Sequence, residues 1–181
     1  MNRHLTNRRN LMQRKATVSS TKFVGFHVPK DQALLAAFGE ITLRHEHMNY
    51  ILKMTIKSLA AITPAEALAA TKYESSRQLW DRIKTLARKV LGDGAALLKL
   101  QALVQTCEAL TEKRNNLVHR LWAKEPEGDA HIRDAHGNER RLPTVDELRA
   151  LAKEIERHTQ HLNVERLEGF LAKALKKRNG A

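Results

Sequence analysis

Apolar residues recur at alternating steps of four and three along most of the chain, and this spacing marks one buried face of a helix. The first series begins after Pro29 and extends to Ile62. Its members are Leu34, Phe38, Ile41, His45, Met48, Leu52, Thr55, Leu59 and Ile62. A series sustained over about 30 residues predicts a helix about 45 Å long in a helical bundle.

Start and stop signals divide the next part of the chain. Thr63-Pro64-Ala65-Glu66 combines a capping threonine, a proline at the first helical position and a capping-box glutamate. It predicts a short, alanine-rich helix that ends near Tyr73. Ser75 or Ser76 then begins a third helix, and Gly92 ends it.

A central helix follows Gly94, and its pattern continues to Trp122 before Pro126. Residues 124–143 are rich in Gly, Asp, His and Pro, and a turn at 136–138 can join a small β-hairpin at 130–142. Thr144-Val145-Asp146-Glu147 is a second capping box. The helix that it begins extends to about residue 178, with a slip in its apolar pattern near Asn163.

These elements predict an all-α fold, an up-and-down bundle of four principal helices plus a short helix. The length of 181 residues suits one domain with a substantial core. We expect the bundle domain to span residues 29–178 and to follow a basic arm at residues 1–28. The presence of only four prolines agrees with long uninterrupted helices.

The net charge of +12 is concentrated at the two ends of the chain. Residues 1–22 carry +6 and residues 173–181 carry +4, neither with an acidic residue, whereas the body carries only +2. Basic ends on a near-neutral body favour contact with the phosphates of nucleic acid, although they are equally typical of solvated tails. The candidate RNA-binding residues are Arg3, Arg8, Arg9, Arg14, Lys15, Lys176 and Lys177.

Several classes of function lack support in the sequence. No spacing of His, Cys and acidic residues predicts a metal site, and no glycine-rich loop predicts a nucleotide cofactor. His45 lies on a core face, which favours a packed histidine over a ligand. No apolar run is long enough for a membrane span, and the N-terminus lacks the apolar stretch of a secretory signal, so we expect a cytoplasmic protein without a membrane partner.

Candidate chemistry is concentrated at the end of the central helix. Arg114 falls where the apolar series calls for a core residue, beside a polar line that includes Glu108, Glu112, Asn115 and His119. An arginine is rarely fully buried unless it is paired or reaches water. Either acidic residue could orient the Arg114 side chain, or the arginine could serve only as a structural ion pair.

The spacing of Arg114 and His119 poses a geometric problem. Five positions along an ideal helix turn a side chain by about 140° and advance it by about 7.5 Å. The two groups meet only if the long arginine bends toward the polar line, or if a symmetric partner presents a second pair opposite the first.

This segment resembles the R-x4-6-H motif of the HEPN superfamily. Arg114, the polar Asn115 directly after it and His119 after four intervening residues match that motif near the end of a long helix. Helix order extends the resemblance over about residues 30–178. HEPN domains are small helical bundles found in toxin–antitoxin, antiphage and RNA-processing proteins.

The resemblance implies a metal-independent endoribonuclease that needs no cofactor. Arg114, Asn115 and His119 would be its catalytic residues, RNA its substrate, a homodimer its working form, and an antitoxin protein a further partner. Two other functions stay open. One is a non-catalytic HEPN-like module that binds RNA, a nucleotide or a protein. The other is a structural helical bundle whose basic ends contact nucleic acid.

Overall fold

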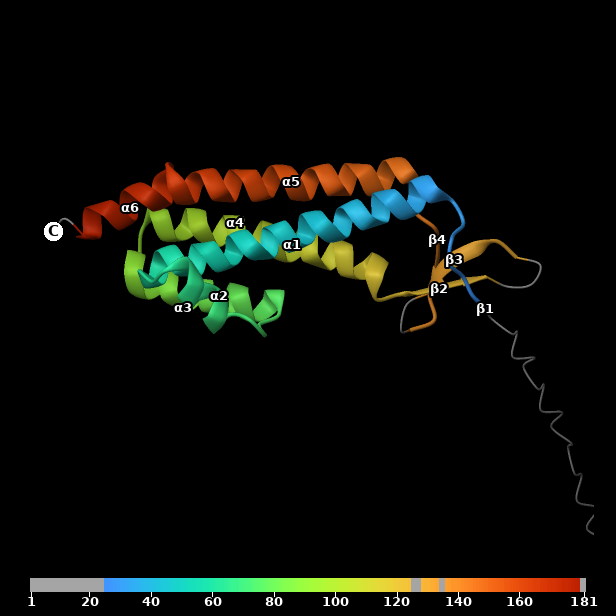
Figure 1. Ribbon diagram of the computed structural model, residues 1–181, viewed down its shortest axis with the longest axis horizontal. Coiled ribbons are helices and arrows are strands. Elements are labelled where there is room, and N and C mark those ends of the chain that lie inside the picture. The colour runs from blue at the N-terminus through green and yellow to red at the C-terminus, as the bar shows by residue number, and fades with distance from the viewer. Residues whose placement is uncertain (1–24, 125–127, 134–135, 180–181) are drawn as a thin grey trace, which may run out of the picture.

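The structure is a computed structural model that describes residues 25–124, 128–133 and 136–179. The chain is mostly helical, with a small antiparallel sheet at one end (Figure 1). The helices are α1 (Gln32–Ala60), α2 (Pro64–Ala70), α3 (Ser76–Leu91), α4 (Ala95–Val118), α5 (Val145–Leu167) and α6 (Phe170–Asn179). The strands are β1 (Gly25–Phe26), β2 (Leu121–Lys124), β3 (Ala130–Arg133) and β4 (Glu139–Arg141).

The helix starts follow the predicted capping signals. Thr63 and Thr144 each form a complete capping box with the glutamate three residues later, and Ser75 forms one with Gln78. Asp31 caps α1 by accepting hydrogen bonds from two backbone N–H groups. Each cap satisfies donors that the first turn of a helix leaves without an intrahelical partner.

The hydrophobic core lies between α1, α3, α4 and α5, and most of the predicted apolar positions line it. Seven of the nine positions predicted for the first helix are buried in α1, whereas Phe38 is half-buried and Ile62, also half-buried, lies beyond the end of α1. His45 is only 3% exposed, so the prediction of a packed histidine is confirmed. Periodicity therefore identified the inward face of α1.

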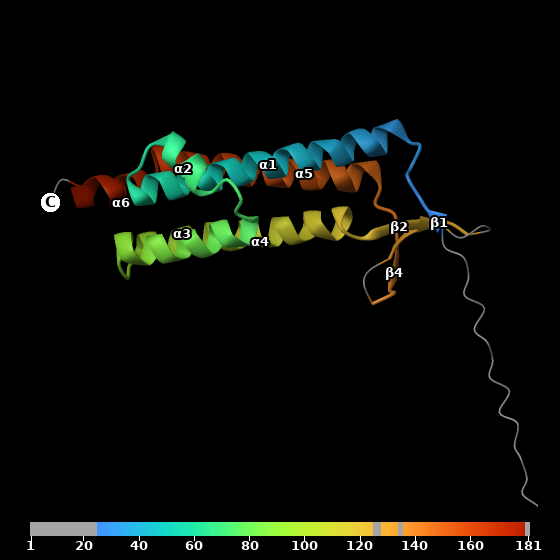
Figure 2. The same cartoon turned by 60° about the horizontal axis from the view of Figure 1, so that its bottom comes forward.

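The directions of the helices do not alternate along the chain. Helices α1 and α5 lie side by side and run the same way, with Arg44 of α1 bound to Glu156 of α5 at 2.5 Å (Figures 1 and 2). Helix α2 returns along α1, so α3 begins beside Asn49 in the second half of α1 (Figure 1). From there α3 runs parallel to α1. The mostly helical class is confirmed, but the strict up-and-down path is not.

The sheet has the order β1-β2-β3-β4, with every pair antiparallel. The predicted hairpin at 130–142 is present as β3 and β4, and it belongs to this larger sheet. The prediction that the central helix continues to Trp122 is wrong, because α4 ends at Val118 and residues 121–124 form β2. Pairing on both edges of β2 and the burial of Ala123 outweigh the local helical pattern.

Trp122 fixes the turn from α4 into the sheet. Its indole N–H donates to the Leu117 carbonyl oxygen at 2.9 Å, and its ring meets Phe38 of α1 edge-on at 5.6 Å. The last helix breaks at Gly169 to give α5 and α6, a few residues beyond the predicted slip. None of the described helices has both the length and the hydropathy needed to cross a membrane.

Candidate active site

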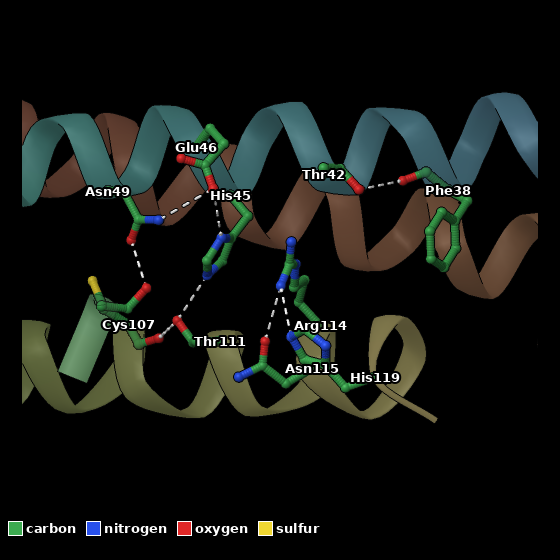
Figure 3. A network of polar contacts seen from close by, with 11 residues as sticks. Phe38, Thr42, His45, Glu46, Asn49, Cys107, Thr111, Arg114, Asn115 and His119 are labelled. Atoms are coloured by element: carbon green, nitrogen blue, oxygen red, sulfur yellow. Dashed lines mark hydrogen bonds and ion pairs between the residues drawn. The ribbon is translucent and has the colours of Figure 1, made fainter. Parts of the chain in front are cut away.

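The end of α4 brings the three predicted catalytic residues together. Arg114 Nη1 lies 3.1 Å from Asn115 Oδ1 and 3.4 Å from His119 Nε2 (Figure 3). His119 is the C-terminal cap of the helix, with φ −100° and ψ 5°, and its N–H still donates to the Asn115 carbonyl oxygen at 3.0 Å. The half-buried arginine bends toward the His119 imidazole. The contact therefore forms within one chain, by the first of the two predicted routes.

The contact between Arg114 and His119 can be a hydrogen bond in only one tautomer of the imidazole. A guanidinium can only donate hydrogen bonds, so His119 Nε2 must accept one in this arrangement. The imidazole is then neutral and carries its proton on Nδ1. Its Nε2 lone pair lies beside a fixed positive charge, and the ring is exposed to solvent. A neutral, accessible imidazole is the form that can accept a proton from a substrate hydroxyl.

A second histidine lies beneath the site. Thr111 Oγ1 donates its proton to the Cys107 carbonyl oxygen at 2.9 Å, so it accepts from His45 Nε2 at 3.1 Å. Burial lowers the pKa of His45, the positive charge of Arg114 lowers it further, and Glu46 opposes them. His45 is therefore neutral and buried, and its hydrogen bond to Thr111 joins α1 to α4 next to Arg114.

Arg114, Asn115 and His119 lie at one end of an open groove of about 920 Å³. One wall is α1 from His45 to Lys53, and the opposite wall is α4 from Gln105 onward. The loop before α3 and the first turn of α3 complete the lining. A hydrogen bond from Ser76 Oγ to Asn49 Oδ1 at 2.9 Å joins the start of α3 to α1.

The charges in the groove leave a positive excess. Lys53, Lys72, Arg77 and Arg114 contribute the cations, and Glu46, Glu74, Glu108 and Glu112 the acids. Two of the acids are already neutralised from outside the lining, Glu74 by Arg82 and Glu108 by Lys84. The remaining balance favours an anionic ligand.

The proposal that a nearby acid orients Arg114 is wrong. Glu108 binds Lys84 of α3, and Glu112 is exposed at the groove without a hydrogen bond to Arg114. The arginine is oriented by Asn115 and His119 instead, while its Nε is buried without a partner. The interhelical pairing of Glu108 could not be predicted from spacing along a single helix.

The groove also includes residues that the sequence did not single out. Lys72, Arg77 and Trp80 reach it from the α2–α3 loop and from α3. None belongs to a motif, and their shared position depends on how α3 packs across α1 and α4. No signal in the sequence could have joined them to Arg114.

Of the predicted RNA-binding residues, the structure describes only Lys176 and Lys177, and neither lines this groove. Lys176 and Lys177 are exposed on α6, at the end of the molecule opposite the sheet, whereas His119 adjoins the sheet (Figure 1). Arg3, Arg8, Arg9, Arg14 and Lys15 lie outside the described residues. The described chain begins at the sheet end, where His27 N donates to the Trp122 carbonyl oxygen at 2.8 Å.

Other reactive groups are inert or dispersed. Burial raises the pKa of the Cys107 thiol to about 12, so it is not a thiolate nucleophile at neutral pH. Within the described ranges, no three His, Cys, Asp or Glu side chains are grouped so that they could hold a metal ion.

Comparison of the chain with models of protein families, with curated proteins and with solved structures finds no match. The geometry of the Arg114 and His119 pair and of its groove is therefore the basis for a functional proposal.

Proposed function

We propose that this protein is a metal-independent endoribonuclease of HEPN type that cuts RNA by attack of the 2′-hydroxyl. The observation that carries the proposal is the contact of Arg114 Nη1 with both Asn115 Oδ1 and His119 Nε2 at the end of a groove with excess positive charge. The resemblance of this segment to the R-x4-6-H motif supplies the reaction class.

The residue types suit the reaction. When the Arg114 guanidinium turns from His119 to the phosphate, the freed Nε2 lone pair accepts the proton of the 2′-hydroxyl, and O2′ attacks the adjacent phosphorus. The bond from phosphorus to the 5′-oxygen breaks, which leaves a 2′,3′-cyclic phosphate and, after protonation, a 5′-hydroxyl. The phosphoryl oxygens gain negative charge in the transition state, and the Arg114 guanidinium stabilises it. Asn115 holds the guanidinium in place.

Protonation of the leaving oxygen calls for a second acid, and the described part of one chain offers only His119 as an exposed imidazole in the groove. A homodimer would supply the second His119. Apolar side chains beside the site favour such an interface: Phe26 is 90% exposed and Val28 is 73% exposed, and both border Leu121 and Trp122. The dimer is part of this proposal.

The cellular role that the HEPN resemblance suggests is a toxin or antiphage effector acting in the cytoplasm. An enzyme that cuts cellular RNA needs restraint, so an antitoxin protein is the expected partner. Residues 29–178 would form the HEPN-like bundle domain, and the basic ends would add contacts to RNA that are independent of sequence.

The decisive experiment measures cleavage of a labelled single-stranded RNA in EDTA. We expect His119→Ala and Arg114→Ala each to reduce the rate by at least about 100-fold, because each removes a group that acts in the transition state. Arg157→Ala is the matched control, since it removes the same charge as Arg114→Ala from an exposed position of α5 outside the groove. Circular dichroism would establish that every variant is folded. Wild-type protein that leaves RNA intact would refute the enzyme.

Among the described residues that line the groove, His119 is the one exposed histidine, and this favours a second candidate, a non-catalytic HEPN-like module that binds RNA in the same groove. Binding without cleavage, weakened by Arg114→Ala, would support that function instead. If binding depended only on residues 1–22 and 173–181, a structural bundle with basic ends would be the better description.

A further inference from the structure

The groove continues well beyond the candidate catalytic pair. Its lining on α4 extends from His119 back to Gln105, and 14 helical positions correspond to about 21 Å. A single phosphodiester at Arg114 and His119 would occupy only one end. The other end lies between Lys53 of α1, the α2–α3 loop and the first turn of α3.

Three cations line this distal end without neutralising partners. Lys53, Lys72 and Arg77 form no ion pair with any described residue. Lys72 and Arg77 are exposed, and the Lys72 ammonium lies 5.1 Å from the centre of the Tyr73 ring, which is itself 88% exposed. These groups are available to a phosphate and, at the rim, to a flat ring.

The distal wall also holds hydrogen-bonding atoms that the protein does not use. Trp80 Nε1 is a buried donor without a protein partner, and Glu74 Oε2 is a buried acceptor without one. Both residues line the groove. Most buried polar atoms in proteins are hydrogen-bonded, so a donor and an acceptor left free beside the groove suit a ligand that carries both kinds of group, once these two side chains turn toward it. The edge of a nucleobase does so.

We propose that the distal end of the groove is a nucleotide subsite for single-stranded RNA. Lys72 and Arg77 bind the backbone phosphate of a nucleotide neighbouring the cleaved bond, and Trp80 Nε1 and Glu74 Oε2 hydrogen-bond to its base. The proposal rests on the proposed function for the identity of the ligand, and it adds the residues that select and position the RNA. An acidic peptide would satisfy the cations, and its amide groups also carry donors and acceptors; RNA is favoured because the same groove ends at the Arg114 and His119 pair.

The test measures binding of a fluorescently labelled 12-nucleotide RNA to the His119→Ala protein by anisotropy, over a series of salt concentrations. We expect added Lys72→Ala and Arg77→Ala to weaken binding roughly tenfold and to reduce the salt dependence, because two phosphate contacts are lost. The matched control is Lys153→Ala with Arg157→Ala, which removes the same charge from an exposed face of α5 outside the groove.

Trp80→Phe tests the base contact, since it keeps a ring but removes the N–H donor. We expect this substitution to weaken binding of the intact RNA. In a set of RNAs that each carry one abasic site, we expect it to have no effect on the RNA whose abasic site occupies the subsite. Equal losses in the groove pair and in the α5 pair would overturn the subsite.

This result is separable from the fate of the enzyme. Wild-type protein that binds RNA through Lys72 and Arg77 without cutting it would refute the nuclease and keep the subsite. Cleavage that is unaffected by Lys72→Ala with Arg77→Ala, at RNA concentrations below saturation, would keep the nuclease and refute the subsite.

Discussion

At the scale of single residues, the candidate site depends on the length of the arginine side chain. Arg114 lies within α4, and His119 is the C-terminal cap of that helix. Five helical positions turn two side chains apart by about 140°. The long Arg114 side chain bends across this angle, so Nη1 and Nε2 approach to 3.4 Å.

His45 gives a prediction for the pH dependence of stability. Its pKa in the folded protein is lowered by burial and by Arg114, whereas in the unfolded chain an imidazole keeps a pKa of about 6.5. As pH falls below about 6.5, His45 becomes protonated in the unfolded chain but stays neutral in the folded protein. Protonation therefore favours the unfolded chain and lowers the free energy of unfolding. We expect a smaller free energy of unfolding at pH 5.5 than at pH 7.5, measured by urea denaturation.

His45→Gln should reduce this difference, because a glutamine amide can still reach Thr111 but does not titrate. Burial also lowers the pKa of His158, which donates to the Leu103 carbonyl oxygen, so part of the dependence should remain. An unchanged pH dependence in His45→Gln would show that His45 does not contribute to it.

At the scale of the elements, two glycines are constrained differently, Gly39 by helix propensity alone and Gly169 by close packing. Gly39 lies on the exposed side of α1, and a Cβ there meets no atom within 4 Å. At Gly169, between α5 and α6, a Cβ would lie 2.7 Å from the Glu165 Cα and 1.9 Å from its Oε2. The same carboxylate oxygen accepts the Phe170 N–H at 2.9 Å.

The two alanine substitutions should therefore act in opposite directions. Gly39→Ala should raise the free energy of unfolding by about 0.5–1 kcal/mol, because alanine favours the helix. Gly169→Ala should lower it, because the backbone at Glu165 cannot yield as a side-chain tip can. Chemical denaturation measures both. If Gly169→Ala were as stable as the wild type, the tight junction between α5 and α6 would be wrong.

At the scale of the whole molecule, the sheet gathers the features that concern function at one end. Strand β1 pairs with β2, which begins two residues after His119, so exposed Phe26 is held near the candidate site. Helix α6, with Lys176 and Lys177, lies at the other end (Figure 1). Lys176 and Lys177 are thus at the opposite end of the helices from the Arg114 and His119 pair.

The exposed apolar side chains allow a test of the proposed dimer. Phe26→Asp together with Val28→Asp should produce a monomer, measured by analytical ultracentrifugation, and should lower cleavage without unfolding the protein. Buried carboxylates in an apolar interface are strongly unfavourable, whereas these positions are exposed in a single chain. Leu43→Asp, at an exposed position on α1 outside these residues, is the control. A wild-type protein that is monomeric while active would contradict the dimer.

The sequence by itself determined the helical class, the capping residues at Thr63 and Thr144, the inward face of α1 and the residues of the candidate pair. These depend on interactions between residues a few positions apart, which periodicity and spacing express directly. Only the tertiary structure decided that Trp122 lies in a strand, that α1 and α5 run parallel, that Glu108 pairs with Lys84, and that Lys72, Arg77 and Trp80 share a groove with His119. Each of these depends on contacts between distant segments, whose free energy of pairing and burial can override local preference and leaves no periodic trace in the chain.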